Sequence, residues 1–452
     1  MRPKLKMTKL VFLLMFFSVG ANAVETAFEQ DKTLPLVYIN VAVKAGSVTD
    51  PKGLQGLTNF TGEMLLRGTN SKTKEQIDLA IDQMGARIEV ETRAEALIVR
   101  GAVLASQIDP FLALVGELVT ESRFPENEIR KLKGQIISDL LDVQGSDPAL
   151  AGIWFDKFLF HGHPYGNPVE GTPSNVAKVN REEILKHYNW LVRDNNFLVV
   201  GSGDADPSKI ETWAESLGKA RPSTPNIQAV EKVAAPTNEP ARRLLIVDKP
   251  DRTQTQINIG QIGTLMTAPD YFPLYLGNYA FGGPSFSARL MVEIRVKRGW
   301  SYGAGSAFRY GLEPRYWRIH LFPAAKDTPP ALAYILGMAE KLKENGITQP
   351  EFAFAQESLV NGAGFMYDTP QKRVENKLIE RTLDLPNGFM KSYGPELRKV
   401  TLPEVNEALK KFLKPDQFAI VVVGTAKELK APLAKAAGIP VKQVNVVPYT
   451  QE

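Results

Sequence analysis

The chain has 452 residues, a length that predicts two or three domains. Its formal net charge of +4 comes from 54 basic and 50 acidic residues, and the four N-terminal residues Arg2, Lys4, Lys6 and Lys9 account for the whole excess. The other charges balance, which argues against a nucleic-acid-binding surface. There is no cysteine, so disulfides and lipid attachment to cysteine are excluded.

Residues 1–23 predict a secretory signal peptide. The basic residues precede an apolar run from Leu10 to Val19, and Ala21-Asn22-Ala23 has the small residues of a cleavage site. The apolar run is too short for a mature membrane anchor, although an uncleaved signal anchor is an alternative. We therefore expect a mature protein that begins near Val24, has no membrane span, and is located in the periplasm of a Gram-negative bacterium.

The remainder of the chain contains an internal duplication. A helix with Asn180 as its N-cap precedes a polar turn and an apolar strand at 197–201. A helix that starts with a Thr401–Glu404 capping box precedes a second such strand at 418–424. The two copies are offset by about 220 residues, half of the chain, which is typical of a duplicated module.

Earlier elements repeat in the same order. A strand, a helix, a strand pair and a long helix are expected at residues 37–43, 57–66, 87–102 and 109–122, and again at 254–259, 271–281, 302–322 and 329–345. We assign residues 24–220 and 242–452 to two homologous halves, joined by a Pro-rich polar linker at 221–241. The expected fold class is α+β, in which each half is an α/β unit with a mostly antiparallel sheet covered by helices on one face.

Residues 56–69 read Gly-Leu-Thr-Asn-Phe-Thr-Gly-Glu-Met-Leu-Leu-Arg-Gly-Thr. This segment resembles the zinc helix of the pitrilysin/insulinase family, with the frame Gly-Leu-x-His-x-x-Glu-His-Met-Leu-x-Lys/Arg-Gly-Thr. The two ligand positions hold Asn59 and Glu63, and the position of the catalytic glutamate holds Gly62. The resemblance places the third ligand near Asp139.

These replacements remove the chemistry that the motif carries. Zinc hydrolysis needs strong nitrogen or sulfur donors, an open coordination position and a general base for the metal-bound water. The Asn59 amide is a poor zinc donor, and Gly62 supplies no base. Glu63 and Asp139 leave open an oxygen site for Mg²⁺ or Ca²⁺, or polar groups that line a leftover cleft. We expect no catalytic residue and no zinc in this chain.

Residues 282–303 carry a second family signature, similar to Gly-Gly-x-x-x-Ser-Arg-Leu followed by Leu-Arg-x-x-x-Gly-x-x-Tyr. In the family this Arg and Tyr hold the substrate backbone near the zinc, and the match places them at Arg295 and Tyr302. A guanidinium and a phenol can both donate hydrogen bonds to a peptide carbonyl. The structural alternative is that Arg295 caps a helix end and Tyr302 fills a strand, and Arg298 is a competing candidate.

Residues 85–92 resemble the edge strand of the family. A substrate peptide can add to such an edge by main-chain hydrogen bonds, here beside Ile88 and Val90. Glu89 and Glu91 fit a second interpretation equally well, in which charged side chains protect the edge against aggregation.

The resemblance implies the short members of the family, in which two proteins pair to enclose a chamber and one of them can lack the zinc motif. We therefore expect a substrate-binding subunit that is inactive alone and belongs to a heteromeric periplasmic zinc peptidase. The expected partner is a paralogous subunit that carries the intact motif and the zinc, and the expected substrates are peptides. The alternatives are a stand-alone peptide-binding or assembly protein and an atypical metal-dependent hydrolase.

Overall fold

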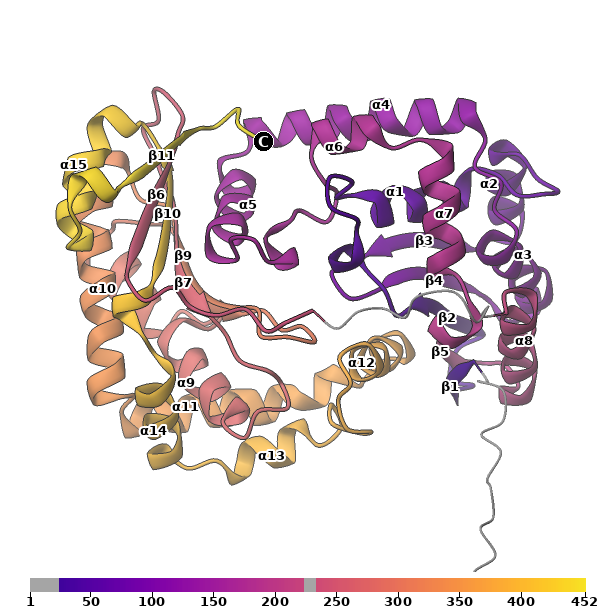
Figure 1. Cartoon of the computed structure of the whole chain (residues 1–452). Helices are drawn as coiled ribbons and strands as arrows, with labels where there is room; N and C mark the ends of the chain where they lie inside the picture. Colours follow the sequence, from indigo (N-terminus) through magenta and orange to yellow (C-terminus); the bar gives the residue numbers. More distant parts are fainter. Residues whose placement is uncertain (1–23, 223–232) are drawn as a thin grey trace, which may run out of the picture.

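The computed structural model describes residues 24–222 and 233–452, so the predicted signal peptide and residues 223–232 of the predicted linker lie outside the described residues. Two sheets form its framework (Figure 1). The first has the strand order β1 (Glu25–Gln30), β5 (Phe197–Gly203), β2 (Leu36–Val43), β4 (Leu97–Leu104), β3 (Arg87–Thr92). The second has the order β11 (Asn445–Pro448), β6 (Arg243–Asp248), β10 (Ala419–Gly424), β7 (Gln256–Ile262), β9 (Tyr316–Leu321), β8 (Ala304–Phe308).

The two sheets share one topology. In each half, the strand that comes first in the chain pairs in parallel with the strand that comes last among those the two halves share. These pairs are β1 with β5 and β6 with β10. The other shared pairings are antiparallel, and β11 adds in parallel to the outer side of β6. The predicted α+β class is confirmed, and the strand correspondence expected from the sequence agrees with this order.

A layer of helices covers one face of each sheet (Figure 1). In the first half these are α1 (Leu57–Met64), α2 (Lys74–Gln83), α3 (Ile108–Thr120), α4 (Glu126–Asp142), α6 (Pro173–Lys178), α7 (Arg181–Leu191) and α8 (Pro207–Ala220). In the second they are α9 (Tyr271–Gly282), α10 (Thr328–Asn345), α11 (Gln349–Gly362), α13 (Tyr393–Lys399), α14 (Leu402–Phe412) and α15 (Ala426–Ala437). No helix among the described residues has the length and apolarity needed to cross a bilayer.

The alternation of side chains along the strands explains this layer. Odd-numbered residues of β2, from Val37 to Val43, face the helices and are almost fully buried. On β4, Gly101 leaves room for the ring of Phe111 from α3, because a Cβ at Gly101 would lie 2.3 Å from Phe111 Cζ. The period of two therefore sets which residues form the core of the half.

The opposite face of each sheet is covered by a helix of the other half. The two exchanged helices are α5 (Asp147–Leu159) and α12 (Pro370–Thr382). Phe155 of α5, from the first half, is buried with Val421 of the second sheet, and Leu378 of α12 is buried with Val200 of the first sheet. Burial of one such side chain contributes about 1.5–3 kcal/mol, so the exchange joins the halves strongly.

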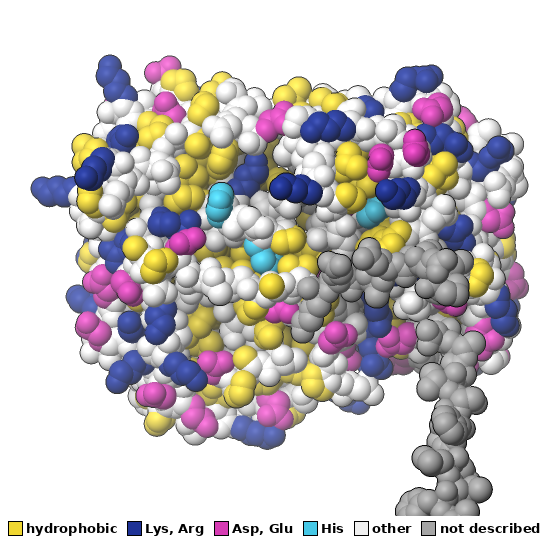
Figure 2. Space-filling view, in the orientation of Figure 1, with side chains coloured by type: hydrophobic (Ala, Val, Ile, Leu, Met, Phe, Trp, Pro, Cys, Tyr) yellow, Lys and Arg dark blue, Asp and Glu magenta, His cyan; other side chains and the backbone are white. Residues whose placement is uncertain are grey.

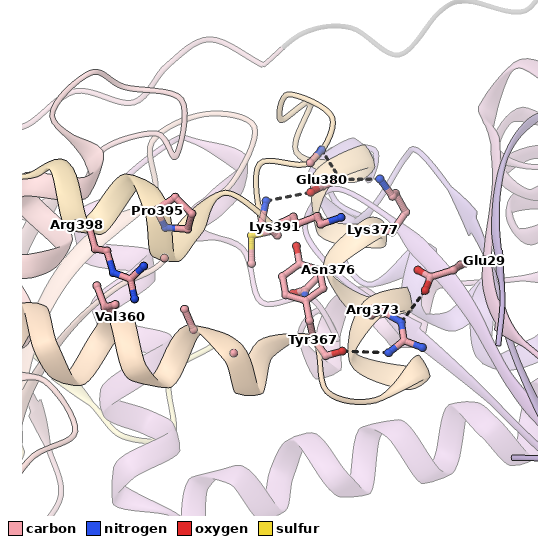
Figure 3. Close-up of a pocket in the computed structure, with 15 residues that line it drawn as sticks. Glu29, Val360, Tyr367, Arg373, Asn376, Lys377, Glu380, Lys391, Pro395 and Arg398 are labelled. Atoms are coloured by element: carbon pink, nitrogen blue, oxygen red, sulfur yellow. Dashed lines mark hydrogen bonds and ion pairs between the residues drawn. The ribbon is translucent and has the colours of Figure 1, made fainter. Parts of the chain in front are cut away.

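Ion pairs reinforce the contact between α12 and the first sheet. Glu375 of α12 lies 2.8 Å from Arg93 and 2.7 Å from Arg100. Arg373 also pairs with Asp31 and lies 3.0 Å from Glu29 of β1. Arg373 lines a cavity of about 520 Å³. Figure 3 shows its guanidinium between the carboxylate of Glu29 and the carbonyl of Tyr367. The Arg373 guanidinium is therefore engaged in contacts that hold α12 against the first sheet.

Basic and acidic side chains of the described residues are interspersed over the face shown in Figure 2. This distribution agrees with the balanced charge of the sequence outside its first residues.

Candidate functional site

The segment with the altered zinc motif forms α1 and the short turn that follows it. Phe60 and Met64 are buried in the core of the first half, whereas Asn59 and Glu63 are only partly buried. Asp50 holds the start of the helix, because its carboxylate accepts hydrogen bonds from the backbone N–H of Gly56 at 2.7 Å and of Thr58 at 2.8 Å.

Asp50 also belongs to a buried polar network below α1. The hydroxyl of Thr58 lies 2.6 Å from Asp50 Oδ1 and 2.8 Å from His187 Nε2 on α7. A Thr58 hydroxyl that donates to Asp50 accepts from a neutral imidazole protonated at Nε2. Burial raises the pKa of Asp50 to about 6 and lowers the pKa of His187 to about 4. The network fixes α1 onto α7, and its two titratable side chains, Asp50 and His187, are both buried.

Packing from the first sheet closes the place of the catalytic base. A Cβ on Gly62 would lie 2.5 Å from Leu97 Cδ1 and 3.0 Å from Val90 Cγ1. Leu97 is only 1% exposed, so its side chain has little room to move. A glutamate at this position would have to displace packed side chains. The surrounding core is therefore packed for glycine at position 62.

The remaining oxygen donors of the motif do not come together as a metal site. Glu63 is half-buried, and burial raises its pKa while nearby Arg67 lowers it. Arg67 itself donates to Glu128 and to Gln135 of α4, whereas Asp139 on α4 is exposed. Within the described ranges, no group of three His, Cys, Asp or Glu side chains is placed to hold a metal ion. The donor set does not fit zinc, and no metal-dependent step follows from it.

The second family signature forms an exposed cluster on the second half. Arg295 lies in the π-helical turn η7 (Met291–Val296), a rare conformation that frequently marks functional sites. Its guanidinium lies 4.2 Å from the ring centroid of Tyr302 and 5.1 Å from that of Phe286. Tyr302 is 76% exposed and Phe286 is 69% exposed. The structure therefore brings Arg295 and Tyr302 together at the surface, and Tyr302 does not fill a strand.

Arg298 has a different environment from Arg295. It forms an ion pair of 2.7 Å with Glu293 and lies 3.6 Å from the ring centroid of Tyr334. Glu293 also accepts from Lys297 and Tyr334, and these hydrogen bonds lower its pKa to about 2. Arg298 is therefore held by contacts within the second half. Among the described residues, Arg295 has no carboxylate within ion-pair distance.

The candidate edge strand is β3, which among the described residues pairs with β4 alone. Ile88 is 8% exposed, and both Ile88 and Val90 pack into the core. Glu89 pairs with Arg87, and Glu91 pairs with Arg93 and Arg100. A peptide that added to this edge would therefore meet the main chain rather than the side chains of Ile88 and Val90.

The hairpin of β8 and β9 carries a group of three arginines that was not expected from the sequence. Arg309, Arg315 and Arg318 line a cavity of about 690 Å³ between the two halves. The signal in the sequence is the alternation of cationic and aromatic residues over positions 308–318. Asp156, a carboxylate that interacts with these arginines, comes from α5 of the other half, and no local pattern reveals this contact.

Comparison with known proteins finds one family along both halves. Residues 25–172 match the family described as Insulinase (Peptidase family M16), and residues 178–359 match the one described as Peptidase M16 inactive domain. The protein named "Non-peptidase homolog YmxG" from Helicobacter pylori is 22% identical over 413 residues, which cover 91% of this chain and 94% of the relative. An "Uncharacterized zinc protease" of Rickettsia bellii is 28% identical over 274 residues, 60% of this chain and 64% of the relative.

Solved structures share the fold. The structure described as peptidase M16 inactive domain from Pseudomonas fluorescens has a TM-score of 0.82 and 24% identity, and the match covers 89% of this chain and 96% of that one. A chain of complex III from Candida albicans has a TM-score of 0.73 and 13% identity, with 93% and 97% covered. The two matches to this family follow one another over residues 25–359, and the chain therefore belongs to the insulinase family of peptidases, family M16.

Proposed function

We propose that this chain is the non-catalytic, substrate-binding subunit of a heteromeric zinc peptidase of the M16 family in the bacterial periplasm. One observation carries the proposal. Arg295 stacks between two exposed aromatic rings with no carboxylate partner among the described residues, while position 62 of α1 has neither a base nor room for one. Such a chain supplies binding groups and leaves the zinc to a partner subunit with the intact motif.

The geometry of Arg295 suits a peptide backbone. A guanidinium that stacks on an aromatic ring keeps the N–H groups at its edge free to donate in the ring plane. The Tyr302 hydroxyl adds a second donor, and the exposed side chains of Phe286 and Val296 add apolar contact area. An extended peptide with a carbonyl over Arg295 satisfies both kinds of contact.

The comparisons support two parts of the proposal. The name of the Helicobacter pylori relative supports a chain without peptidase activity. The likeness to a chain of complex III supports a place in an assembly of several subunits. The basic and apolar N-terminus supports export to the periplasm.

Affinity purification of the tagged chain from its native host tests the proposal. We expect a second M16 chain with an intact His-x-x-Glu-His motif to co-purify, together with peptidase activity that a zinc chelator abolishes. Recovery of the chain alone, with peptide binding but no peptidase activity, would instead favour the stand-alone peptide-binding or assembly protein. Chelator-sensitive cleavage by the pure chain would favour the atypical hydrolase.

A further inference from the structure

The cavity between the halves has the volume of a ligand site. Its volume of about 690 Å³ lies within the range of small-molecule pockets, which occur preferentially where domains meet. The turn between β3 and β4 lines it from the first half, and the β8–β9 hairpin, α9 and the end of α12 line it from the second. Arg309 at its border is exposed, so the cavity is open to solvent there.

The cavity holds an excess of positive charge. Arg309, Arg315 and Arg318 all interact with one carboxylate, Asp156 of α5. An Arg315 Nη lies 3.9 Å from Asp156 Oδ2, which is too long for a hydrogen bond. Arg315 is 6% exposed, and its Nε and Asp156 Oδ1 are both buried without a hydrogen-bond partner. Buried charges of this kind are ordinarily paired more closely.

A fourth arginine of the cavity does not add to this excess of positive charge. Arg93 also lines the cavity, but it pairs with Glu91 at 2.6 Å and with Glu375 at 2.8 Å. Burial moreover drives Asp156 toward its neutral form, because it raises the pKa of this carboxyl to about 6 despite the three arginines. Glu95 of the turn between β3 and β4 also lines the cavity. Asp156 and Glu95 together therefore leave one of the three positive charges on the hairpin without a negative counterpart.

The rest of the lining includes aromatic side chains from the second half, and Glu91 and Glu95 from the first. Tyr271 and Tyr393 face each other with hydroxyls 2.6 Å apart, which satisfies each of them. The ring of Tyr275 packs edge-on against Tyr393 at 5.6 Å. A lining that combines cationic and aromatic side chains is complementary to a molecule that has an anionic group next to an apolar one.

We propose that this cavity binds a carboxylate attached to an apolar or aromatic group, with Arg309 and Arg318 as its direct partners and Arg315 below them. Planar guanidinium groups match the two oxygens of a carboxylate. The chemistry is shared by a small carboxylic acid and by the C-terminus of a peptide. This site goes beyond the proposed function, because it needs neither the partner subunit nor its zinc.

Calorimetric titration of the full mature chain tests the site. The first probe is N-acetyl-L-phenylalanine, and its amide, N-acetyl-L-phenylalaninamide, is the uncharged counterpart. We expect the acid to bind about 10- to 100-fold more tightly than the amide, since each charge-assisted hydrogen bond is worth about that much. Equal binding of the two, or no binding of the acid, would overturn the proposal.

Four variants separate a ligand site from a structural tie between α5 and the hairpin. R309Q and R318Q should each weaken binding of the acid about 10-fold or more and leave melting temperature nearly unchanged. R130Q, which removes an exposed arginine of α4, is the charge-matched control and should bind as the wild type does. D156N should tighten binding, because it removes the competing carboxylate. A structural tie alone predicts a lower melting temperature for D156N with no gain in affinity, and that result would contradict the site.

Two further probes identify the source of the carboxylate. N-acetyl-Ala-Ala-Phe with a free C-terminus should bind more tightly than the single residue if peptide C-termini are the ligands, and more weakly if small acids are. Inorganic phosphate tests charge alone. Phosphate that bound as tightly as the acid would overturn the carboxylate assignment.

Discussion

A methyl group added at Gly62 should destabilise the protein, although the same change stabilises most helices. Glycine to alanine in a helix interior contributes about 0.5–1 kcal/mol of stability in favourable sites. At Gly62 the new Cβ would lie 2.5 Å from Leu97 Cδ1 and 3.0 Å from Val90 Cγ1. Overpacking of this kind costs about 1–3 kcal/mol. We therefore expect Gly62→Ala to lower the free energy of unfolding by about 0–2.5 kcal/mol.

Gly134 provides the matched control. It lies in α4, and a Cβ there would meet no atom within 4 Å. Gly134→Ala should therefore stabilise the protein by about 0.5–1 kcal/mol. Urea unfolding followed by circular dichroism measures both variants, and the difference between them should be about 1–3 kcal/mol. If the two variants shifted the midpoint equally, the closed packing at Gly62 would be refuted.

A double variant tests whether Leu97 is the obstructing side chain. Leu97→Ala alone should cost about 2–5 kcal/mol, because it leaves a cavity in the core. In that background the Gly62→Ala methyl group has room, so it should stabilise rather than destabilise. A methyl group that still destabilised the Leu97→Ala protein would mean that another contact, such as Val90, dominates.

In the purified complex, Arg295→Ala should lower kcat/KM of the partner about 30- to 1000-fold and leave folding unchanged, with Arg130→Ala as a neutral control; equal rates would remove the substrate-holding role. Because burial lowers the pKa of His187 to about 4, the unfolded chain binds a proton at this residue between about pH 6.5 and 4 while the folded chain does not. Lowering the pH from 7 to 4 should therefore reduce the free energy of unfolding of the wild type by about 3 kcal/mol through this residue. The stability lost on His187→Gln should consequently be about 3 kcal/mol smaller at pH 4 than at pH 7. Glu375→Gln weakens the ion pairs with Arg93 and Arg100, so limited proteolysis within α12 should become faster; an unchanged cleavage rate would show that apolar contacts alone hold that helix.

Much of the fold could be predicted from the sequence because its strands and caps have strong local patterns. β5 and β10 are continuous apolar runs, and the repeated helix starts have recognisable caps. β1 escaped notice because it is short, and its Glu25-Thr26-Ala27-Phe28-Glu29-Gln30 sequence is only half-buried at the sheet edge. β11 is shorter still and largely exposed. Polar edge strands carry little of the periodic signal on which such prediction depends.

The exchange of α5 and α12 could not be predicted, because local sequence does not specify which sheet a helix covers. The aromatic stripe around Trp154 and Phe155 indicates burial, and the structure places it against β-strands of the other half. The same limitation hid the cationic hairpin. Arg315 becomes a notable residue only once α5 brings Asp156 beside it, and that contact joins positions in different halves.

The altered zinc helix shows how chemistry and packing separate in this chain. The positions that agree with the family frame include Leu57, Met64 and Leu65, which are at most 1% exposed and support the core. Gly56 also agrees, and its φ of 96° together with the backbone of Glu170, 2.6 Å from a Cβ at Gly56, requires glycine. The altered ligand positions, Asn59 and Glu63, are the partly exposed ones. The helix therefore retains the shape that supports β3 and the core, while the positions that carry the metal ligands and the base in the family frame hold other residues.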